Sequence, residues 1–165
     1  MTQALRKARG GLVIDVVVES DRWRQDSETA AVARRAVTEA ATTLSTGQAE
    51  IAIVLTDDSA MRALNRAWRG VDKATNVLSF PTQRSDETPR LLGDIVLAYE
   101  TIAREARSQR KPFAHHVAHL AVHGFLHLLG YDHERRTDAE AMERTEREIL
   151  QRLAVPDPYG HPAKA

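Results

Sequence analysis

Four histidines recur at every fourth position, and no other feature of this chain constrains its fold as strongly. They are His115, His119, His123 and His127. Because an α-helix brings positions four apart onto one face, this spacing predicts a helix that carries a row of imidazole rings. The residues around the second half of the row, LAVHGFLHLLG, are mostly apolar. They suit the dry, rigid wall that a chemical site needs.

The end of this helix predicts a metal site. One zinc ion needs nitrogen ligands at about 2.0–2.1 Å, whereas residues eight apart lie about 12 Å apart along a helix, so a straight helix supplies only two of these histidines. Gly130 is placed to end the helix in a left-handed conformation, and His133 follows that turn. The predicted ligands are therefore His123, His127 and His133, with the fourth tetrahedral position left for water.

The types of residue present restrict the chemistry of that site. The chain has no cysteine, so the ligands of the metal must be nitrogen and oxygen atoms. The absence of cysteine is also compatible with a reducing compartment. The motif is similar to H-E-x-x-H, but Gly124 stands where that motif places its general base. Peptide hydrolysis is therefore disfavoured. A water bound to zinc can still ionise near pH 7, at a pKa of about 7, without a carboxylate.

The neighbours of the predicted ligands keep several interpretations open. Asp132 either orients an imidazole or accepts a proton, or it only closes the turn before His133. We expect His115, His116 and His119 to be ordinary structural or surface histidines, although one of them could border the site.

The rest of the chain predicts short strands mixed with helices. Because strands and helices do not alternate strictly, the expected fold is α+β, a small mixed sheet of about four strands with helices packed on it. Residues 1–155 are expected to form one domain, and 156–165 a frayed tail. Ser27 is expected to cap the first helix. Strands are expected at 12–18, 49–55, 75–81 and 91–99, and helices at 27–44, 57–69, 100–109, 113–129 and 136–153.

Charge and hydropathy exclude several classes of protein. Lys plus Arg equals Asp plus Glu at 23 each, so no global basic field indicates a nucleic-acid partner. No run approaches the roughly 18 apolar residues of a membrane span. The basic start could mimic a signal peptide, but Asp15 interrupts its apolar stretch. We therefore expect a cytoplasmic protein with neither a membrane nor DNA as its partner.

Local charge offers one candidate for anion binding. Arg62, Arg66 and Arg69 are spaced four and three apart, which places them on one face of a short helix, and Lys73 follows shortly after. Such a stripe suits phosphate contacts, and arginine adds a planar bidentate fork. The alternative is a solvated helix face.

Three motifs together resemble the YbeY family of bacterial endoribonucleases, which act in ribosomal RNA maturation. The motifs are HGFLHLLGYDH, LNRAWRGVDKATNVLSFP and LLGDIVLAY. The resemblance runs from about residue 50 to residue 150, and the first fifty residues match only in outline. It implies a small α+β domain with a groove beside one Zn²⁺ per chain. It also implies that His123, His127 and His133 bind this zinc and that Arg69 faces the substrate.

The resemblance implies a single-strand-specific endoribonuclease that matures the 3′ end of 16S rRNA and acts in ribosome quality control. Its partners would be an rRNA precursor and the ribosome or a small-subunit particle. In our hypothesis zinc polarises the phosphate or supplies hydroxide, Arg69 stabilises developing charge, and Arg62, Arg66 and Lys73 contact RNA. Water, Asp132 or the RNA 2′-hydroxyl could fill the role of the absent base.

Two alternatives remain at this stage. One is a non-catalytic ribosome assembly factor with a structural zinc, and the other is a metallohydrolase that acts on another substrate.

Overall fold

The computed structural model describes residues 6–7, 11–82 and 90–160. The four predicted strands and the five predicted helices are confirmed, with ends that shift by one or two residues, and a two-residue strand and a short helix are added. The strands are β1 (Arg6–Lys7), β2 (Leu12–Val18), β3 (Ala49–Thr56), β4 (Val77–Pro81) and β5 (Arg90–Ala98). The helices are α1 (Asp21–Gln25), α2 (Ser27–Thr43), α3 (Asp58–Arg69), α4 (Tyr99–Ser108), α5 (Phe113–Leu128) and α6 (Arg136–Arg152).

The described strands form one mixed sheet in the order β1-β2-β3-β5-β4. The central strands β2, β3 and β5 are parallel, whereas β1 and β4 pair antiparallel at the two edges. Along β2, buried residues alternate with partly exposed ones, and Asp15 lies on the partly exposed face. The α+β prediction is confirmed, with β1 as a fifth, minimal strand.

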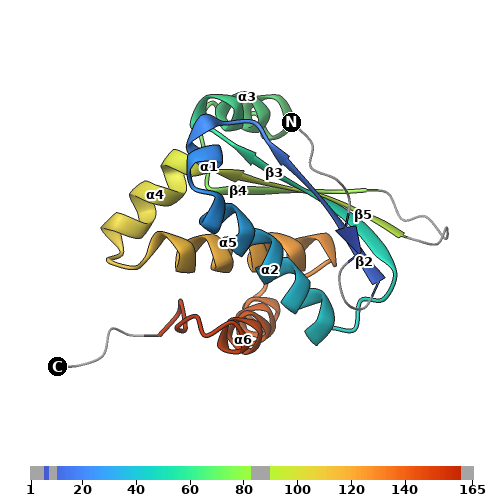
Figure 1. The fold of residues 1–165 in the computed structure, drawn as a ribbon. Helices are drawn as coiled ribbons and strands as arrows, with labels where there is room; N and C mark the ends of the chain where they lie inside the picture. Colours follow the sequence, from blue (N-terminus) through green and yellow to red (C-terminus); the bar gives the residue numbers. More distant parts are fainter. Residues whose placement is uncertain (1–5, 8–10, 83–89, 161–165) are drawn as a thin grey trace.

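Helices cover both faces of the sheet. Figure 1 shows α3 on one face and α2 and α5 on the other, with α6 beyond α5. The larger core lies on the α2 and α5 side and includes Trp23, Ile53 and Phe125, all fully buried. A smaller core under α3 contains Met61 and Leu78. Each fully buried side chain of this size contributes roughly 1.5–3 kcal/mol, so the larger core carries most of the apolar stabilisation.

Local capping signals account for the ends of α3. The Asp57 carboxylate accepts a hydrogen bond from the Ala60 N–H at 2.8 Å, and Gly70 ends the helix with φ of 70°. Both ends agree with the sequence prediction. The predicted cap of α2 was wrong, because Asp26 accepts from the Thr29 N–H at 3.3 Å while Ser27 is already the first helical residue.

Helix α5 lies unusually close to the edge of the sheet at Gly124. A Cβ atom there would come within 2.9 Å of Ile95 Cγ2 and 3.2 Å of Ser79 Oγ. The Ser79 hydroxyl donates to the Gly124 carbonyl at 2.8 Å. Gly124 therefore allows the helix to press onto β4 and β5, and this packing leaves no room for the glutamate of an H-E-x-x-H motif.

The described helices include none with both the length and the apolar content that crossing a bilayer requires.

Candidate metal centre

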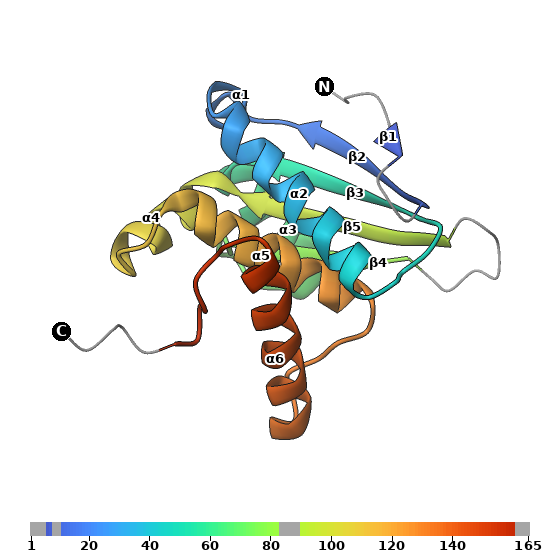
Figure 2. The same ribbon diagram turned by 60° about the horizontal axis from the view of Figure 1, so that its bottom comes forward.

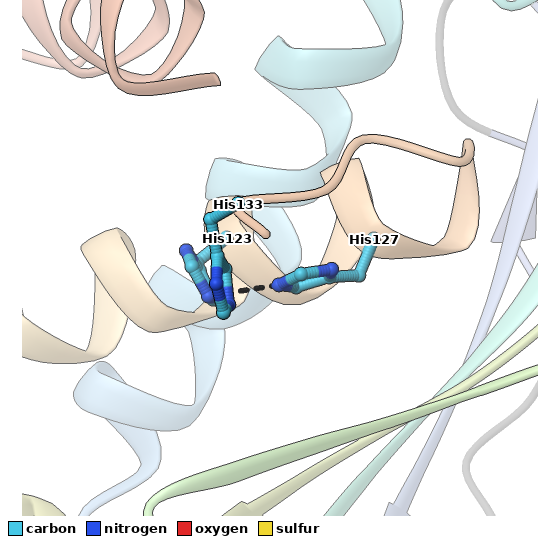
Figure 3. Close-up of side chains that lie close together, drawn as sticks. All are labelled: His123, His127 and His133. Atoms are coloured by element: carbon cyan, nitrogen blue, oxygen red, sulfur yellow. Dashed lines mark hydrogen bonds between the residues drawn. The ribbon is translucent and has the colours of Figure 1, made fainter. Parts of the chain in front are cut away.

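Three histidines converge where α5 ends. His123 and His127 lie one turn apart on the helix, and His133 returns toward them from the loop that follows Gly130, whose φ is 97° (Figure 3). The Nε2 atoms of His123 and His127 are 3.0 Å apart, and one ring nitrogen of each histidine lies within 4.8 Å of the others. Two ligands of a tetrahedral zinc ion are about 3.3 Å apart. The three predicted ligands are therefore arranged so that they could hold one metal ion.

A buried carboxylate that the sequence motifs did not indicate lies behind this cluster. Glu146 of α6 has a side chain only 1% exposed, and its Oε1 lies 2.9 Å from His123 Nδ1. Its Oε2 accepts from the Tyr159 hydroxyl and lies 2.7 Å from His119 Nε2. With Nδ1–H donating to Glu146, His123 presents an unprotonated Nε2, which is the form that binds a metal.

The electrostatics of the centre favour a neutral ring at His127 and an ionised carboxylate at Glu146. Burial raises the pKa of Glu146, but hydrogen bonds from His119 and His123 outweigh burial and lower it to about 2. Burial lowers the pKa of His127, and the nearby rings of His123 and His133 lower it further. A neutral ring and an ionised carboxylate are the protonation states that metal binding requires of these groups.

The helices bring the carboxylate into place. Helix α6 packs against α5, and the chain after α6 returns toward α5 (Figure 2). Tyr159 belongs to this returning segment, within residues 156–165 that the sequence assigns to a frayed tail, and its ring meets the ring of His119 edge-on at 5.4 Å. Arg147 and Asp157 form an ion pair at 3.0 Å along the same path. Residues 161–165, with His161, lie outside the described residues.

The three histidines line a cavity of about 550 Å³. Arg69 lines this cavity from the end of α3, and Ser79 and Pro81 line it from β4. A second hollow of about 560 Å³ shares Arg69 and Asn76 with the first. The two hollows therefore meet at Arg69, which stands where a substrate bound to the metal would extend away from it.

The predicted basic stripe divides between two surfaces. Arg69 reaches the metal cavity, and Lys73 lines the hollow beside it. Arg62 and Arg66 instead line a separate hollow. Arg62 also binds the carboxylate of Asp72 through two hydrogen bonds of 2.8 and 3.0 Å. The spacing on the helix alone did not reveal this division.

Asp132 closes the turn that carries the third histidine. Its Oδ1 accepts from the His133 N–H at 2.6 Å and from the Glu134 N–H at 3.2 Å. An aspartate that accepts from backbone N–H groups just after it forms an Asx turn. Of the two interpretations of Asp132, these hydrogen bonds support the turn.

The remaining histidines of α5 have different surroundings. His119 borders the cavity, the alternative to a purely structural role that the sequence left open for one of them. His116 is buried, and its Nε2 lies 2.9 Å from Glu105 Oε1. Asn76 donates to the same carboxylate oxygen at 2.9 Å. His116 therefore supports the wall of the second hollow through Glu105 and does not face the metal cavity.

Comparisons with known proteins agree with this geometry. A family model described as Endoribonuclease YbeY matches residues 16–154. A protein named Endoribonuclease YbeY from Nitrobacter winogradskyi is 52% identical over 160 residues, covering 92% of this chain and 84% of its own. One of the same name from Rhodopseudomonas palustris (strain BisA53) is 52% identical over 158 residues, covering 92% of both. The solution structure of TM1509 from Thermotoga maritima is similar in fold, with a TM-score of 0.53 at 23% identity, covering 92% of this chain and 99% of that one.

Proposed function

This chain belongs to the endoribonuclease YbeY family, and from that premise we propose that it is a zinc-dependent endoribonuclease specific for single-stranded RNA. The observation that carries the proposal is the meeting of two groups in one cavity. Three histidines that could hold a metal ion line the same cavity as an arginine from another helix, Arg69 of α3. A metal ion and a guanidinium are the two cationic groups that hydrolysis of a phosphodiester needs most.

His123, His127 and His133 would hold one zinc ion per chain. The donor set fits zinc, because it consists of imidazole nitrogens in a chain without cysteine. Glu146 fixes the orientation of His123 and keeps its Nδ1 protonated. Carboxylates that hydrogen-bond to a ligating histidine are a common support of zinc sites.

The chemistry divides between the metal and the protein. When bound, zinc supplies a Lewis acid for a phosphate oxygen or a water molecule. Arg69 lies at the cavity wall, exposed enough to meet a phosphate. Its planar guanidinium can donate two hydrogen bonds to nonbridging oxygens and stabilise the negative charge that grows on them.

The identity of the nucleophile determines the products. Two backbone N–H groups already donate to Asp132. This arrangement supports water or the RNA 2′-hydroxyl, and not Asp132, as the nucleophile or base. Attack by the 2′-hydroxyl leaves a cyclic phosphate, whereas attack by water leaves a linear phosphate. Analysis of product ends by mass spectrometry separates the two.

The proposed substrate is the precursor of small-subunit rRNA, cut near the 3′ end of 16S rRNA in the cytoplasm. With 23 basic and 23 acidic residues, the chain lacks the strong positive field that would give it high affinity for RNA by itself. Specificity would therefore come from the small-subunit particle or the ribosome, where the same activity would serve quality control.

The openness of the site argues against a purely structural zinc. Structural zinc sites are usually closed by four protein ligands. Here the group around His127 contains three histidines, one of them exposed, and faces a cavity. The assembly-factor alternative therefore has less support than catalysis. Failure of the zinc-loaded wild-type protein to cut RNA in the following assay would favour hydrolysis of another substrate.

The test compares Arg69→Ala with wild-type protein on an end-labelled, unstructured RNA, with zinc content measured in parallel. We expect cleavage to fall by at least about tenfold, since a lost transition-state contact of this kind costs several kcal/mol, while zinc stays bound. Arg35→Ala is the matched control, because Arg35 is an exposed arginine on α2 and does not line this cavity. Equal loss of zinc and of cleavage in Arg69→Ala would contradict the separate roles.

A further inference from the structure

An exposed tryptophan stands next to the arginine of the cavity. Trp68 precedes Arg69 in the last turn of α3, and it is 71% exposed, whereas the other tryptophan of the chain, Trp23, is fully buried. Single exposed apolar residues are common on protein surfaces. Trp68 therefore needs evidence that its position is controlled before a role can be assigned.

That evidence comes from its neighbours. The ring of Trp68 meets the ring of Phe80 edge-on, with centroids 5.7 Å apart and planes at 63°. Phe80 belongs to β4, and the residues on either side of it, Ser79 and Pro81, line the metal cavity. Gly70 ends α3 directly after Arg69. Trp68 is thus held against β4, a strand that borders the cavity, and directly precedes Arg69, while most of its surface stays open to solvent.

We propose that Trp68 is a stacking platform for an unpaired base of the RNA next to the phosphate that is cut. This inference rests on the proposed function. Proteins that bind single-stranded nucleic acid combine cations that contact the backbone with aromatic rings on which bases stack. Trp68 follows this pattern, because the exposed cation Arg69 comes directly after it in the last turn of α3 and lines the cavity.

The charge around the ring favours RNA over a protein as its occupant. A protein docking site is expected to be a contiguous apolar patch. Near Trp68, Phe80 is partly buried, and the exposed helix surface carries arginines. An exposed ring on a helix whose exposed side chains include arginines suits a ligand that alternates flat bases with phosphates.

Stacking on Trp68 also provides a reason for selecting single strands. A base in a duplex is stacked on its neighbours and paired, so it cannot lie on a protein ring without leaving the helix. An unpaired base has a free face and is bound at no such cost. Trp68 would therefore contribute to the strand preference, and Arg69 to the chemistry.

The fluorescence of the two tryptophans gives a direct test. Trp23 is buried and donates its Nε1–H to the Thr56 carbonyl at 2.9 Å, so a rapid emission change on binding reports Trp68. The zinc-loaded protein is mixed with a short single-stranded RNA, or with an oligonucleotide of equal length and charge that has no bases. Emission is read in a stopped-flow instrument before cleavage proceeds. We expect quenching by the RNA and little quenching by the abasic strand.

The matching kinetic test uses Trp68→Ala, Trp68→Phe and the control Leu91→Ala. Leu91 is another exposed apolar residue, 56% exposed, on β5. Loss of one stacked base reduces affinity by roughly 5- to 150-fold. We therefore expect Trp68→Ala to raise KM about tenfold with less than a twofold change in kcat, and Trp68→Phe to restore part of the loss. Leu91→Ala should match wild type.

The outcomes separate this inference from the function on which it rests. If Trp68→Ala cuts RNA with the KM of wild type, or if the abasic strand quenches as strongly as RNA, the stacking role is overturned while the nuclease proposal stands. If wild-type protein cuts no RNA but base-dependent quenching remains, stacking stands and the proposed function falls.

Discussion

Glu146 is the side chain on which the geometry of the histidine cluster most depends. It is almost fully buried, and its two oxygens bind His123, His119 and Tyr159 at 2.7–2.9 Å. An ionised carboxylate at this position increases the basicity of the His123 ring and fixes its orientation. Loss of the Glu146 charge should therefore first reduce the affinity of the site for its metal.

We expect Glu146→Gln to reduce zinc affinity by about 10- to 100-fold, the usual effect of removing a carboxylate that supports a ligating histidine. The measurement is competition with a chromophoric chelator at pH 7.5. Glu148→Gln is the control, because Glu148 lies on the same helix but is exposed and pairs with Arg152 at the surface. Unchanged affinity in a folded Glu146→Gln protein would contradict the role of Glu146.

Asp132 offers a second test at a single residue. Asparagine keeps the side-chain oxygen that accepts from the His133 N–H but cannot act as a base. Alanine has neither the accepting oxygen nor a basic group. We expect Asp132→Asn to keep kcat within about threefold of wild type, because the Asx turn is retained. Asp132→Ala should weaken zinc binding. A large loss of kcat in Asp132→Asn with zinc still bound would instead make Asp132 the general base.

At the scale of the elements, the site depends on how closely α5 lies on the sheet. Gly124→Ala would place a methyl group 2.9 Å from Ile95 Cγ2 and 3.2 Å from Ser79 Oγ. We expect the free energy of unfolding to fall by about 1–3 kcal/mol, as is usual for an extra carbon in a filled core. Urea denaturation measures the change.

Gly130→Ala is the informative comparison for that variant. A Cβ atom at Gly130 would meet nothing within 4 Å, but φ is 97°. Gly130→Ala should lower the free energy of unfolding by about 1–2 kcal/mol, through strain in the backbone alone. If Gly124→Ala is as stable as wild type, α5 can move away from the sheet and the close packing is not essential.

The parts of this structure that could be predicted are those determined by residues close together in the sequence. Asp57 and Gly70 mark the ends of α3, and the turn after Gly130 brings His133 back to the helix, so the metal cluster followed from spacing. Glu146 could not be found in this way, because its partners are 23 and 27 residues distant. The available signal was a glutamate on the apolar face of α6, between buried Met142 and Ile149.

Contacts between distant elements explain the other features that the sequence alone did not predict. The place of Arg69 in the cavity came from the family resemblance, since spacing on α3 assigned it the same surface as Arg62 and Arg66. The end of α3 meets the histidines only because β4 is the edge strand that pairs with β5. The Asp26 cap of α2 was missed because α1, five residues long, was not expected before it.

At the scale of the whole molecule, the buried His116 links stability to pH. Burial lowers its pKa and Lys111 and His119 lower it further, while Glu105 opposes this shift. Because the folded pKa lies below the unfolded value of about 6.5, the unfolded chain binds the proton first as pH falls. The contribution of His116 to stability is therefore complete above about pH 6.5 and decreases below it.

We expect His116→Asn to flatten the loss of stability below pH 6.5, by at most about 1.4 kcal/mol per pH unit. Urea unfolding of wild type and variant from pH 5 to pH 8, at one fixed zinc concentration, measures the difference. His115→Asn, a partly exposed neighbour on the same helix, controls for the substitution itself. Parallel pH profiles of His116→Asn and wild type would refute the linkage.

The charge balance of the molecule predicts a weak dependence of RNA binding on salt. Besides the metal, the two joined hollows present Arg69, Lys73 and Arg104 as cations. Each phosphate contact with single-stranded nucleic acid contributes about −0.7 to the slope of log K against log salt, so we expect a slope of about −2. Fluorescence anisotropy from 50 to 300 mM salt provides the value. A slope steeper than about −5 would indicate a larger basic surface.

The most direct test of the account is cleavage of an end-labelled precursor that spans the 3′ end of small-subunit rRNA. Wild-type protein and His123→Ala are purified in parallel, and the zinc content of each is determined. The account predicts that wild type cuts the RNA and that His123→Ala loses both its zinc and its cleavage. Equal cleavage by the two proteins would contradict it, because the activity would then not depend on the histidine cluster.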